Sequence, residues 1–178
     1  MNDFPLEIPP VPTVSRPHMP DYGLAESQDG LLSWQDVSQK MAQARNYWVC
    51  TTRPDGRPHA APVWGLWLNE TFYFGTGHSS VKGRNLAHNP AISLHLESGD
   101  DVVILEGDVS PVTDPALLRL IYELYGQKYG MDMSASAEDA ANPTYGLRPA
   151  AAFAWLEQDF PHTATRFIFP TRKHAEAC

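Results

Sequence analysis

Short stretches of alternating apolar and polar residues run through most of the chain and constrain its fold more than any other feature. Tight turns are predicted between neighbouring stretches at Pro54-Asp55-Gly56, Asn69-Glu70 and Gly99-Asp100. Strands joined by such short turns pair antiparallel, and closing them into a barrel removes exposed sheet edges. The sequence therefore predicts a mainly β fold of six or seven antiparallel strands, a barrel or a sandwich, rather than a doubly wound parallel sheet. The expected strands span residues 47–53, 57–68, 71–76, 91–97, 102–112, 150–157 and 165–169.

The second expected strand, residues 57–68, contains Pro58 and Pro62. Proline has no backbone N–H to donate to a neighbouring strand. This strand is therefore expected to lie at a sheet edge or to carry a bulge or bend.

Helices are expected at the margins of the strands. Ser33 followed by Asp36 resembles a capping box, and it precedes helical spacing over about residues 34–45. A short helix is expected from Ser80 to His88, and a third starts at Asp114-Pro115 and loosens at 126–130. Residues 131–149 are small, polar and proline-containing, which predicts a loop able to act as a lid.

The two ends of the chain differ from its middle. Six of the 16 prolines fall in the first 20 residues, so residues 1–30 are expected to form an extended arm. This arm is either loose or lies across the domain or a partner through Phe4, Leu6, Ile8 and Val11. The folded domain is expected over residues 31–172, followed by a tail at 173–178.

Charge and cysteine content limit the classes of partner. Thirteen Lys and Arg against 21 Asp and Glu give a net charge of −8, so no nucleic-acid partner is expected. No run of about 18 apolar residues is present, and we expect neither a membrane span nor a signal peptide. Cys50 and Cys178 form no CxxC pair, which favours a cytoplasmic location. No HxxxH or HxH spacing occurs, so no metal site is expected.

The segment with the clearest chemical potential is residues 76–86, Thr-Gly-His-Ser-Ser-Val-Lys-Gly-Arg-Asn-Leu, at a predicted strand-to-helix junction. Backbone N–H groups at a helix start carry partial positive charge and lack partners in their own helix. Serine hydroxyls and Lys82 would complete a phosphate pocket there. The spacing is neither that of a Walker A loop nor GxGxxG. A solvated, cationic helix start without a ligand is the alternative.

Several fragments in a fixed order resemble the pyridoxamine 5′-phosphate oxidase-like split β-barrel family, and more closely its branch of F-420- and flavin-dependent oxidoreductases. The resemblance covers about residues 33–170. The fragments are Thr52…Asp55-Gly56-Arg57-Pro58, Pro62-Val63-Trp64, Phe74-Gly75-Thr76-Gly77, Lys82-Gly83-Arg84-Asn85-Leu86, Asn89-Pro90, Glu106-Gly107 and Thr165-Arg166-Phe167.

The resemblance implies a split-barrel domain, a homodimer and two cofactor sites at the subunit interface. It implies coenzyme F-420 or FMN as the cofactor and a small molecule as the substrate. The cofactor ring would lie along the second strand, where Trp64 offers a stacking surface. No side chain is assigned as the catalytic acid or base. The implied cofactor-binding residues are Pro62, Val63, Trp64, Thr76, Ser79, Ser80, Lys82, Arg84 and Asn85.

Two positions depart from the family pattern. Pyridoxamine phosphate oxidases carry an Arg on the second strand that grips the FMN phosphate, whereas residues 63–67 here contain no cation. Many relatives also have Arg where this chain has Ser80. Lys82 with Arg84-Asn85 is more similar to the deazaflavin branch.

The leading hypothesis is an oxidoreductase that transfers hydride between coenzyme F-420, or FMN, and an unidentified small organic substrate. The protein would supply binding, orientation and water exclusion, and the cofactor would supply the redox chemistry. Two alternatives remain: a non-catalytic barrel that binds a flavin or haem, and a true pyridoxamine 5′-phosphate oxidase.

Overall fold

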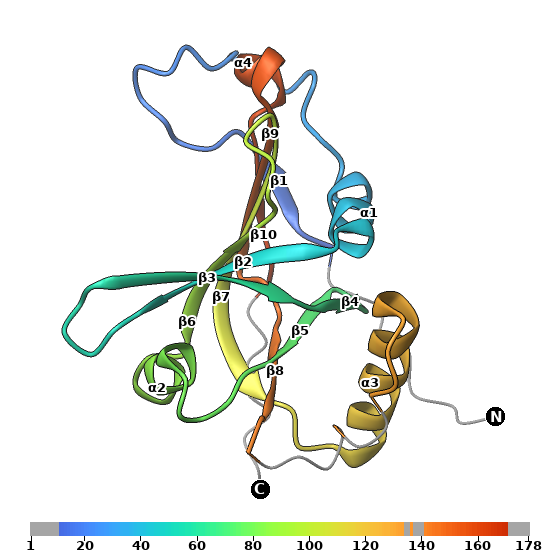
Figure 1. Cartoon of the computed structure of the whole chain (residues 1–178). Coiled ribbons are helices and arrows are strands. Elements are labelled where there is room, and N and C mark those ends of the chain that lie inside the picture. Colours follow the sequence, from blue (N-terminus) through green and yellow to red (C-terminus); the bar gives the residue numbers. More distant parts are fainter. Residues whose placement is uncertain (1–10, 134–135, 137–140, 171–178) are drawn as a thin grey trace, which may run out of the picture.

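The computed structural model describes residues 11–133, 136 and 141–170. Within them the chain is mainly β, and every strand pairing is antiparallel, as expected (Figure 1). The strands are β1 (Thr13–Ser15), β2 (Asn46–Thr52), β3 (Pro58–Trp64), β4 (Leu66–Leu68), β5 (Thr71–Gly75), β6 (Ala91–His95), β7 (Asp101–Pro111), β8 (Thr144–Leu147), β9 (Ala151–Leu156) and β10 (Thr165–Ile168).

The hydrogen-bonded path through these strands closes on itself. From β3 it runs through β2, β6 and β7 to β8, then through β5 to β4, which follows β3 directly in the chain. The 11-residue β7 makes this closure possible because its first part pairs with β6 and β9, and Val109–Pro111 pairs with β8. The remaining strands, β9, β10 and β1, extend the sheet outward from β7 (Figure 1). The result is a barrel with a protruding sheet.

The described residues form four α-helices: α1 (Trp34–Gln43), α2 (Val81–His88), α3 (Pro115–Tyr129) and α4 (Phe160–Thr163). The first three lie beside the barrel, and α4 lies at the far end of the protruding sheet, next to β9 (Figure 1). The expected caps are confirmed: Ser33 Oγ accepts the N–H of Asp36 at 3.1 Å, and Asp114 Oδ1 accepts that of Ala116 at 2.8 Å. None of the helices in the described part of the chain is long and apolar enough to cross a membrane.

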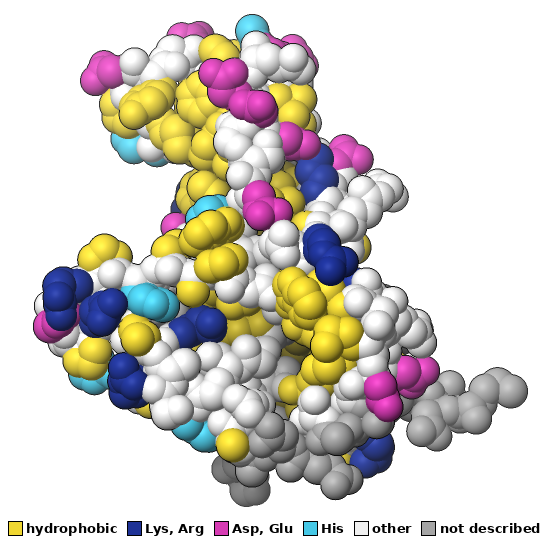
Figure 2. All heavy atoms as spheres, viewed as in Figure 1, with side chains coloured by type: hydrophobic (Ala, Val, Ile, Leu, Met, Phe, Trp, Pro, Cys, Tyr) yellow, Lys and Arg dark blue, Asp and Glu magenta, His cyan; other side chains and the backbone are white. Residues whose placement is uncertain are grey.

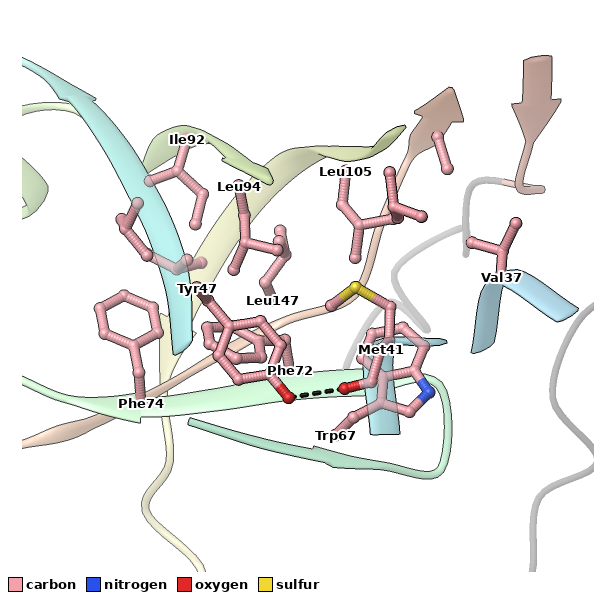
Figure 3. Packing of buried hydrophobic residues seen from close by; sticks show 14 of the residues in the cluster. Val37, Met41, Tyr47, Trp67, Phe72, Phe74, Ile92, Leu94, Leu105 and Leu147 are labelled. Carbon is pink, nitrogen blue, oxygen red and sulfur yellow. Dashed lines mark hydrogen bonds between the residues drawn. The ribbon is translucent and has the colours of Figure 1, made fainter. Parts of the chain in front are cut away.

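The main core fills the barrel and continues beneath α1 (Figure 3). Tyr47, Phe72 and Phe74 are almost completely buried and meet aliphatic side chains from β6 and β7. The Tyr47 hydroxyl donates to the carbonyl of Met41 at 2.5 Å, which satisfies a polar atom inside this core. A smaller cluster around Leu66, Tyr73 and Ile121 holds α3 against β4 and β5.

The long second strand expected at 57–68 is divided in the structure. Trp64 is the last residue paired with β2, and Leu66 is the first paired with β5, so the chain changes partner at Gly65. A Cβ atom at Gly65 would lie 2.2 Å from the Phe72 ring, which explains the glycine. The edge and bend expected from Pro58 and Pro62 are confirmed, because β3 pairs only with β2 within the described residues.

The described residues form ten strands rather than the six or seven expected, because the sequence analysis missed short strands. Residues 131–149, expected to be a loop, contain β8, which pairs with β5 and β7. Its four residues are flanked by prolines and interrupted by Gly146, so their alternation was too short to detect. The lid expected here falls partly on 134–135 and 137–140, outside the described residues. The third helix also continues through Gly126 and ends at Gly130, whose φ is 70°.

The described part of the proline-rich arm is attached to the domain. Thr13–Ser15 pair with β10. The Arg16 guanidinium donates to the carbonyls of Ser27, Asp29, His162 and Ala164. Thr13–Arg16 therefore attach the arm to the rest of the chain, whereas the contact expected through Val11 is not made, since Val11 is 84% exposed. Phe4, Leu6, Ile8 and the tail at 173–178 are outside the described residues.

Replacing Gly65 with alanine is expected to lower the free energy of unfolding by roughly 1–3 kcal/mol, because the new methyl group would overlap the buried Phe72 ring. Urea unfolding measures this change. The matched control is Gly99→Ala, where a Cβ meets no atom within 4 Å and the expected change is within about 0.5 kcal/mol. Equal stability of the two variants would contradict the proposed packing.

Candidate functional site

Two hydroxyl side chains meet at the start of α2, one from just after the end of β5 and one from the N-cap of the helix. Ser80 is the N-cap, and its Oγ accepts the N–H of Gly83 at 2.9 Å. The Thr76 hydroxyl, buried just after β5, lies 3.0 Å from the same Oγ. Val81 and Lys82 occupy the first helical positions, where N–H groups have no acceptor in their own helix. Partial positive charge therefore collects at this end of α2.

Glycines allow the loop before α2 to press against the helix. A Cβ at Gly83 would lie only 2.2 Å from the carbonyl oxygen of Gly77. A Cβ at Gly77 would lie 2.9 Å from the side-chain oxygen of Asn142. The backbone of the loop at Gly77 thus packs directly against the backbone of the helix at Gly83. This contact fixes the directions of the N–H groups at the helix start.

Lys82 is half-buried beside this helix start. Burial lowers the pKa of its ammonium group, because desolvation disfavours the charged form. No side chain or carbonyl of the described residues forms a hydrogen bond or ion pair with it. A partly desolvated cation without a partner gains free energy when an anion binds beside it.

Two of the predicted site residues serve the architecture of α2. The Arg84 guanidinium donates to the Ser79 carbonyl and so closes the preceding loop, with both residues exposed. The Asn85 side chain is 2% exposed, and its amide donates to the Thr51 hydroxyl on β2 at 2.9 Å. Thr51 Oγ1 is in turn 3.4 Å from His59 Nδ1 on β3. Asn85 therefore fastens α2 to the β2–β3 hairpin.

The three predicted residues on β3 lie on two faces of the strand. Val63 is half-buried and packs against the main core, on the same face as His59. Pro62 and Trp64 point to the opposite, exposed face. Within one chain, the structure brings Thr76, Ser79, Ser80, Lys82 and Arg84 together around the start of α2, whereas Pro62 and Trp64 are separate from them.

Trp64 forms part of an aromatic and cationic group that the sequence analysis missed. Its ring stacks on Tyr129 at 4.6 Å between centroids and 9° between planes. The Arg45 guanidinium lies 5.4 Å from the Trp64 ring and 5.5 Å from the Tyr129 ring. Tyr129 lies one helical turn beyond Tyr125, so extending the pattern of α3 would have found it. Arg45 gives no comparable signal.

Lys128 ties the end of α3 to the bend at Gly65. Its ammonium donates to the Tyr47 hydroxyl at 2.8 Å and to the Gly65 carbonyl at 3.0 Å. Burial lowers the pKa of Lys128 from 10.5 to about 8. Burial also raises the pKa of Tyr47, so this phenol remains a neutral hydrogen-bonding partner.

Positive charge is concentrated near the candidate site despite the net charge of −8. Figure 2 shows Lys and Arg side chains gathered where the β2–β3 hairpin and α2 lie in Figure 1. Arg53, Arg57, Lys82 and Arg84 belong to these elements and the turn between them. The described residues contain no group of three or more His, Cys, Asp or Glu that could hold a metal ion. The gathered Lys and Arg side chains favour an anion as the ligand of this region.

Comparison with known proteins identifies related sequences. Residues 35–160 match the family described as pyridoxamine 5′-phosphate oxidase. A curated pyridoxine/pyridoxamine 5′-phosphate oxidase from Acidothermus cellulolyticus is 33% identical over 122 residues, which cover 67% of this chain and 50% of that protein. The chain thus spans about half the length of the curated relative that it matches.

Solved structures share the fold. A conserved hypothetical protein, Rv2991 from Mycobacterium tuberculosis, is similar with a TM-score of 0.66 and 19% identity, covering 86% of this chain and 98% of that one. An F-420 reductase is similar with a TM-score of 0.52 and 25% identity, covering 64% of this chain and 94% of that one. These likenesses extend over most of both neighbours.

The lowered pKa of Lys128 predicts a pH dependence of stability. Between about pH 8 and 10 the unfolded chain still holds a proton on this lysine that the folded chain has released. The free energy of unfolding therefore rises with pH in this window through Lys128. Urea unfolding should show wild type gaining stability relative to Lys128→Arg, whose guanidinium stays protonated. If the difference in free energy of unfolding between wild type and Lys128→Arg stayed constant from pH 7.5 to 9.5, the lowered pKa of Lys128 would be contradicted.

Proposed function

Because the chain belongs to the pyridoxamine 5′-phosphate oxidase family, we propose that it is an oxidoreductase that binds a flavin or deazaflavin coenzyme and acts on a small organic substrate. The preferred coenzyme is F-420, with FMN as the second candidate. The proposal assigns the anionic tail of the coenzyme to the start of α2. Its ring is assigned to β3, beside Pro62, Val63 and Trp64.

The observation that carries this proposal is the state of Lys82. Lys82 is half-buried, has no hydrogen-bond or ion-pair partner among the described residues and lies in the first turn of α2, where backbone N–H groups also lack acceptors in their helix. A phosphate beside them would accept a charge-assisted hydrogen bond from Lys82 and further bonds from the backbone. The residues present therefore fit the anionic tail shared by both coenzymes.

The other predicted residues divide into those able to touch the coenzyme and those that position the site. The exposed Ser79 and the charge of Arg84 lie beside the tail site, and Ser80 and Thr76 hold the loop in shape. Asn85 acts through Thr51 by fixing α2 against β2. The bound coenzyme supplies the hydride-transfer chemistry, while these residues bind it, orient it and restrict water.

The preference for F-420 over FMN rests on the charges of β3. Residues 58–64 contain no Lys or Arg, so β3 offers no strong cation to a compact FMN phosphate. The cations instead lie on α2 and on the turn of the β2–β3 hairpin. The same lack of a β3 cation makes pyridoxamine 5′-phosphate oxidation a weaker candidate, even though the curated relative carries that name.

We propose a homodimer in which the two copies meet through the sheet face opposite the main core. Aligned residues on five neighbouring strands form a row there, and most are apolar or aromatic and only partly exposed. Figure 2 shows hydrophobic side chains reaching the surface over the middle of the molecule. A second copy covering this row would remove an apolar patch from water and bring two coenzyme sites to the interface. The row comprises Pro62, Trp48, His95, Ile104 and Phe153.

Replacing Lys82 with alanine is expected to weaken coenzyme binding by about 1.5–3 kcal/mol, the range for a hydrogen bond to a charged group. Isothermal titration with F-420 and with FMN measures the affinity and identifies the preferred coenzyme. Lys40→Ala is the matched control, since Lys40 pairs with Asp101 at 2.5 Å and should leave the titration unchanged. An unaltered titration of the Lys82 variant would refute the assigned tail site.

Spectra and turnover test the catalytic part of the proposal. We expect flavin or deazaflavin absorbance from the loaded protein and its bleaching or recovery with a suitable electron donor or acceptor. A Soret band would favour the haem-binding alternative. A tightly bound coenzyme that never turns over would favour a non-catalytic carrier.

Ile104→Glu is expected to convert the dimer into monomers, because it places a charge within the apolar row, between His95 and Phe153. Sedimentation equilibrium at micromolar concentration measures the molecular mass. Met131→Glu is the control, since Met131 is 48% exposed and lies outside this row. A monomeric wild-type protein would contradict the dimer.

A further inference from the structure

A cavity of about 410 Å³ lies between the end of β5, α3 and the chain that leads into β8. We propose that it binds a small, neutral aromatic molecule carrying a hydroxyl or similar hydrogen-bonding group, separately from the coenzyme. This inference rests on the cavity alone and does not require the proposed oxidoreductase function.

Aromatic rings form much of the cavity wall. Tyr73 and Phe74 contribute from β5, and Tyr122 and Tyr125 contribute from α3. Rings in such a wall pack by offset stacking or edge-to-face contact with another aromatic ring, which favours a flat ligand. The packing of α3 on β4 and β5 through the second core cluster holds these walls in place.

The described part of the wall carries no charge, which favours a neutral ligand. None of the described residues that line the cavity is Asp, Glu, Lys, Arg or His. A charged ligand would lose hydration there without gaining an opposite charge. The cavity therefore differs from the start of α2, where Lys82 and Arg84 provide positive charge.

Hydroxyl groups at the wall give the ligand polar partners. The Tyr122 hydroxyl lies 2.8 Å from Thr144 Oγ1, so these two groups already satisfy one another. Tyr125 is different, because its hydroxyl has no hydrogen-bond partner among the described residues. Burial raises the pKa of Tyr125, so the phenol stays protonated and able to donate. No buried side-chain oxygen or nitrogen of the described residues lacks a partner, so this hydroxyl is open to solvent and available to a ligand oxygen.

The size of the cavity limits the ligand to one or two fused rings. Its volume falls near the lower end of the range for small-molecule pockets, about 300–1,000 Å³. Gly75 leaves part of this space open, since a Cβ there would lie 3.7 Å from the Tyr122 hydroxyl oxygen. A larger side chain at Gly75 would enter the cavity without a strained backbone.

Only two of the lining residues, Thr76 and Gly77, also belong to the region around α2. Lys82, Arg84 and Asn85 do not line the cavity. The two sites are therefore neighbours with different chemistry, one cationic and one neutral and aromatic.

Equilibrium dialysis of the full chain with 2-naphthol and with 2-naphthoate tests the proposal, because the two probes share a ring system and differ in charge. We expect saturable binding of one 2-naphthol per chain and at least tenfold weaker binding of 2-naphthoate. Gly75→Leu should abolish 2-naphthol binding by filling the cavity. Gly99→Leu, the same change at an open position, should leave it unchanged.

Three results would overturn the proposal: equal binding of both probes, undiminished binding to a folded Gly75→Leu variant, or displacement of 2-naphthol by F-420 or FMN. Displacement would mean that the cavity belongs to the coenzyme site. If thermal unfolding shows that Gly75→Leu does not fold, binding of 2-naphthol to the Tyr125→Phe variant tests the proposal instead. Loss of its hydroxyl should weaken 2-naphthol binding about two- to tenfold, and no loss would overturn the proposal. A failed coenzyme titration would leave these results unaffected.

Discussion

The bend at Gly65 is the constraint on which the barrel depends. There the chain leaves its pairing with β2 and begins its pairing with β5, so one continuous segment joins both sides of the barrel. The absence of a side chain lets the backbone pass the Phe72 ring, and Lys128 and Tyr129 hydrogen-bond to the Gly65 backbone. The end of α3 is thereby fixed to the end of β3. Any displacement at this bend would also displace Trp64.

The start of α2 depends on packing between backbones rather than on a recognisable phosphate motif. Gly83 and Gly77 allow close contact between loop and helix, and Ser80 and Thr76 hold it through hydroxyl groups. Asn85 and Thr51 then fix the helix to the hairpin. This arrangement leaves Lys82, unlike Arg84, without a hydrogen-bond or ion-pair partner in the described residues. The function proposed for the site follows from this contrast: the neighbouring side chains hold the loop and helix in place, whereas Lys82 is available to a ligand.

The sequence predicted most of the fold because local signals were strong where strands were long or turns tight. Ser33, Asp114 and the two prolines of β3 each indicated a feature that the structure confirms. β8 could not be predicted, since four residues interrupted by a glycine are stabilised by pairing with β5 and β7 rather than by their own pattern. Of the candidate site, the sequence predicted the cluster around Ser80 and Lys82. It could not predict the stacking of Arg45, Trp64 and Tyr129, which depends on contacts between distant segments.

The close packing of Gly83 against Gly77 has a consequence for binding thermodynamics. A flexible phosphate loop must lose conformational entropy when it closes on its ligand, and that loss reduces affinity. Here the loop is already held in one arrangement by its contacts with the helix and by the hydroxyl pair. Association should therefore involve little ordering of this chain, and differences in affinity among ligands should arise mainly from electrostatics and desolvation at the ammonium group.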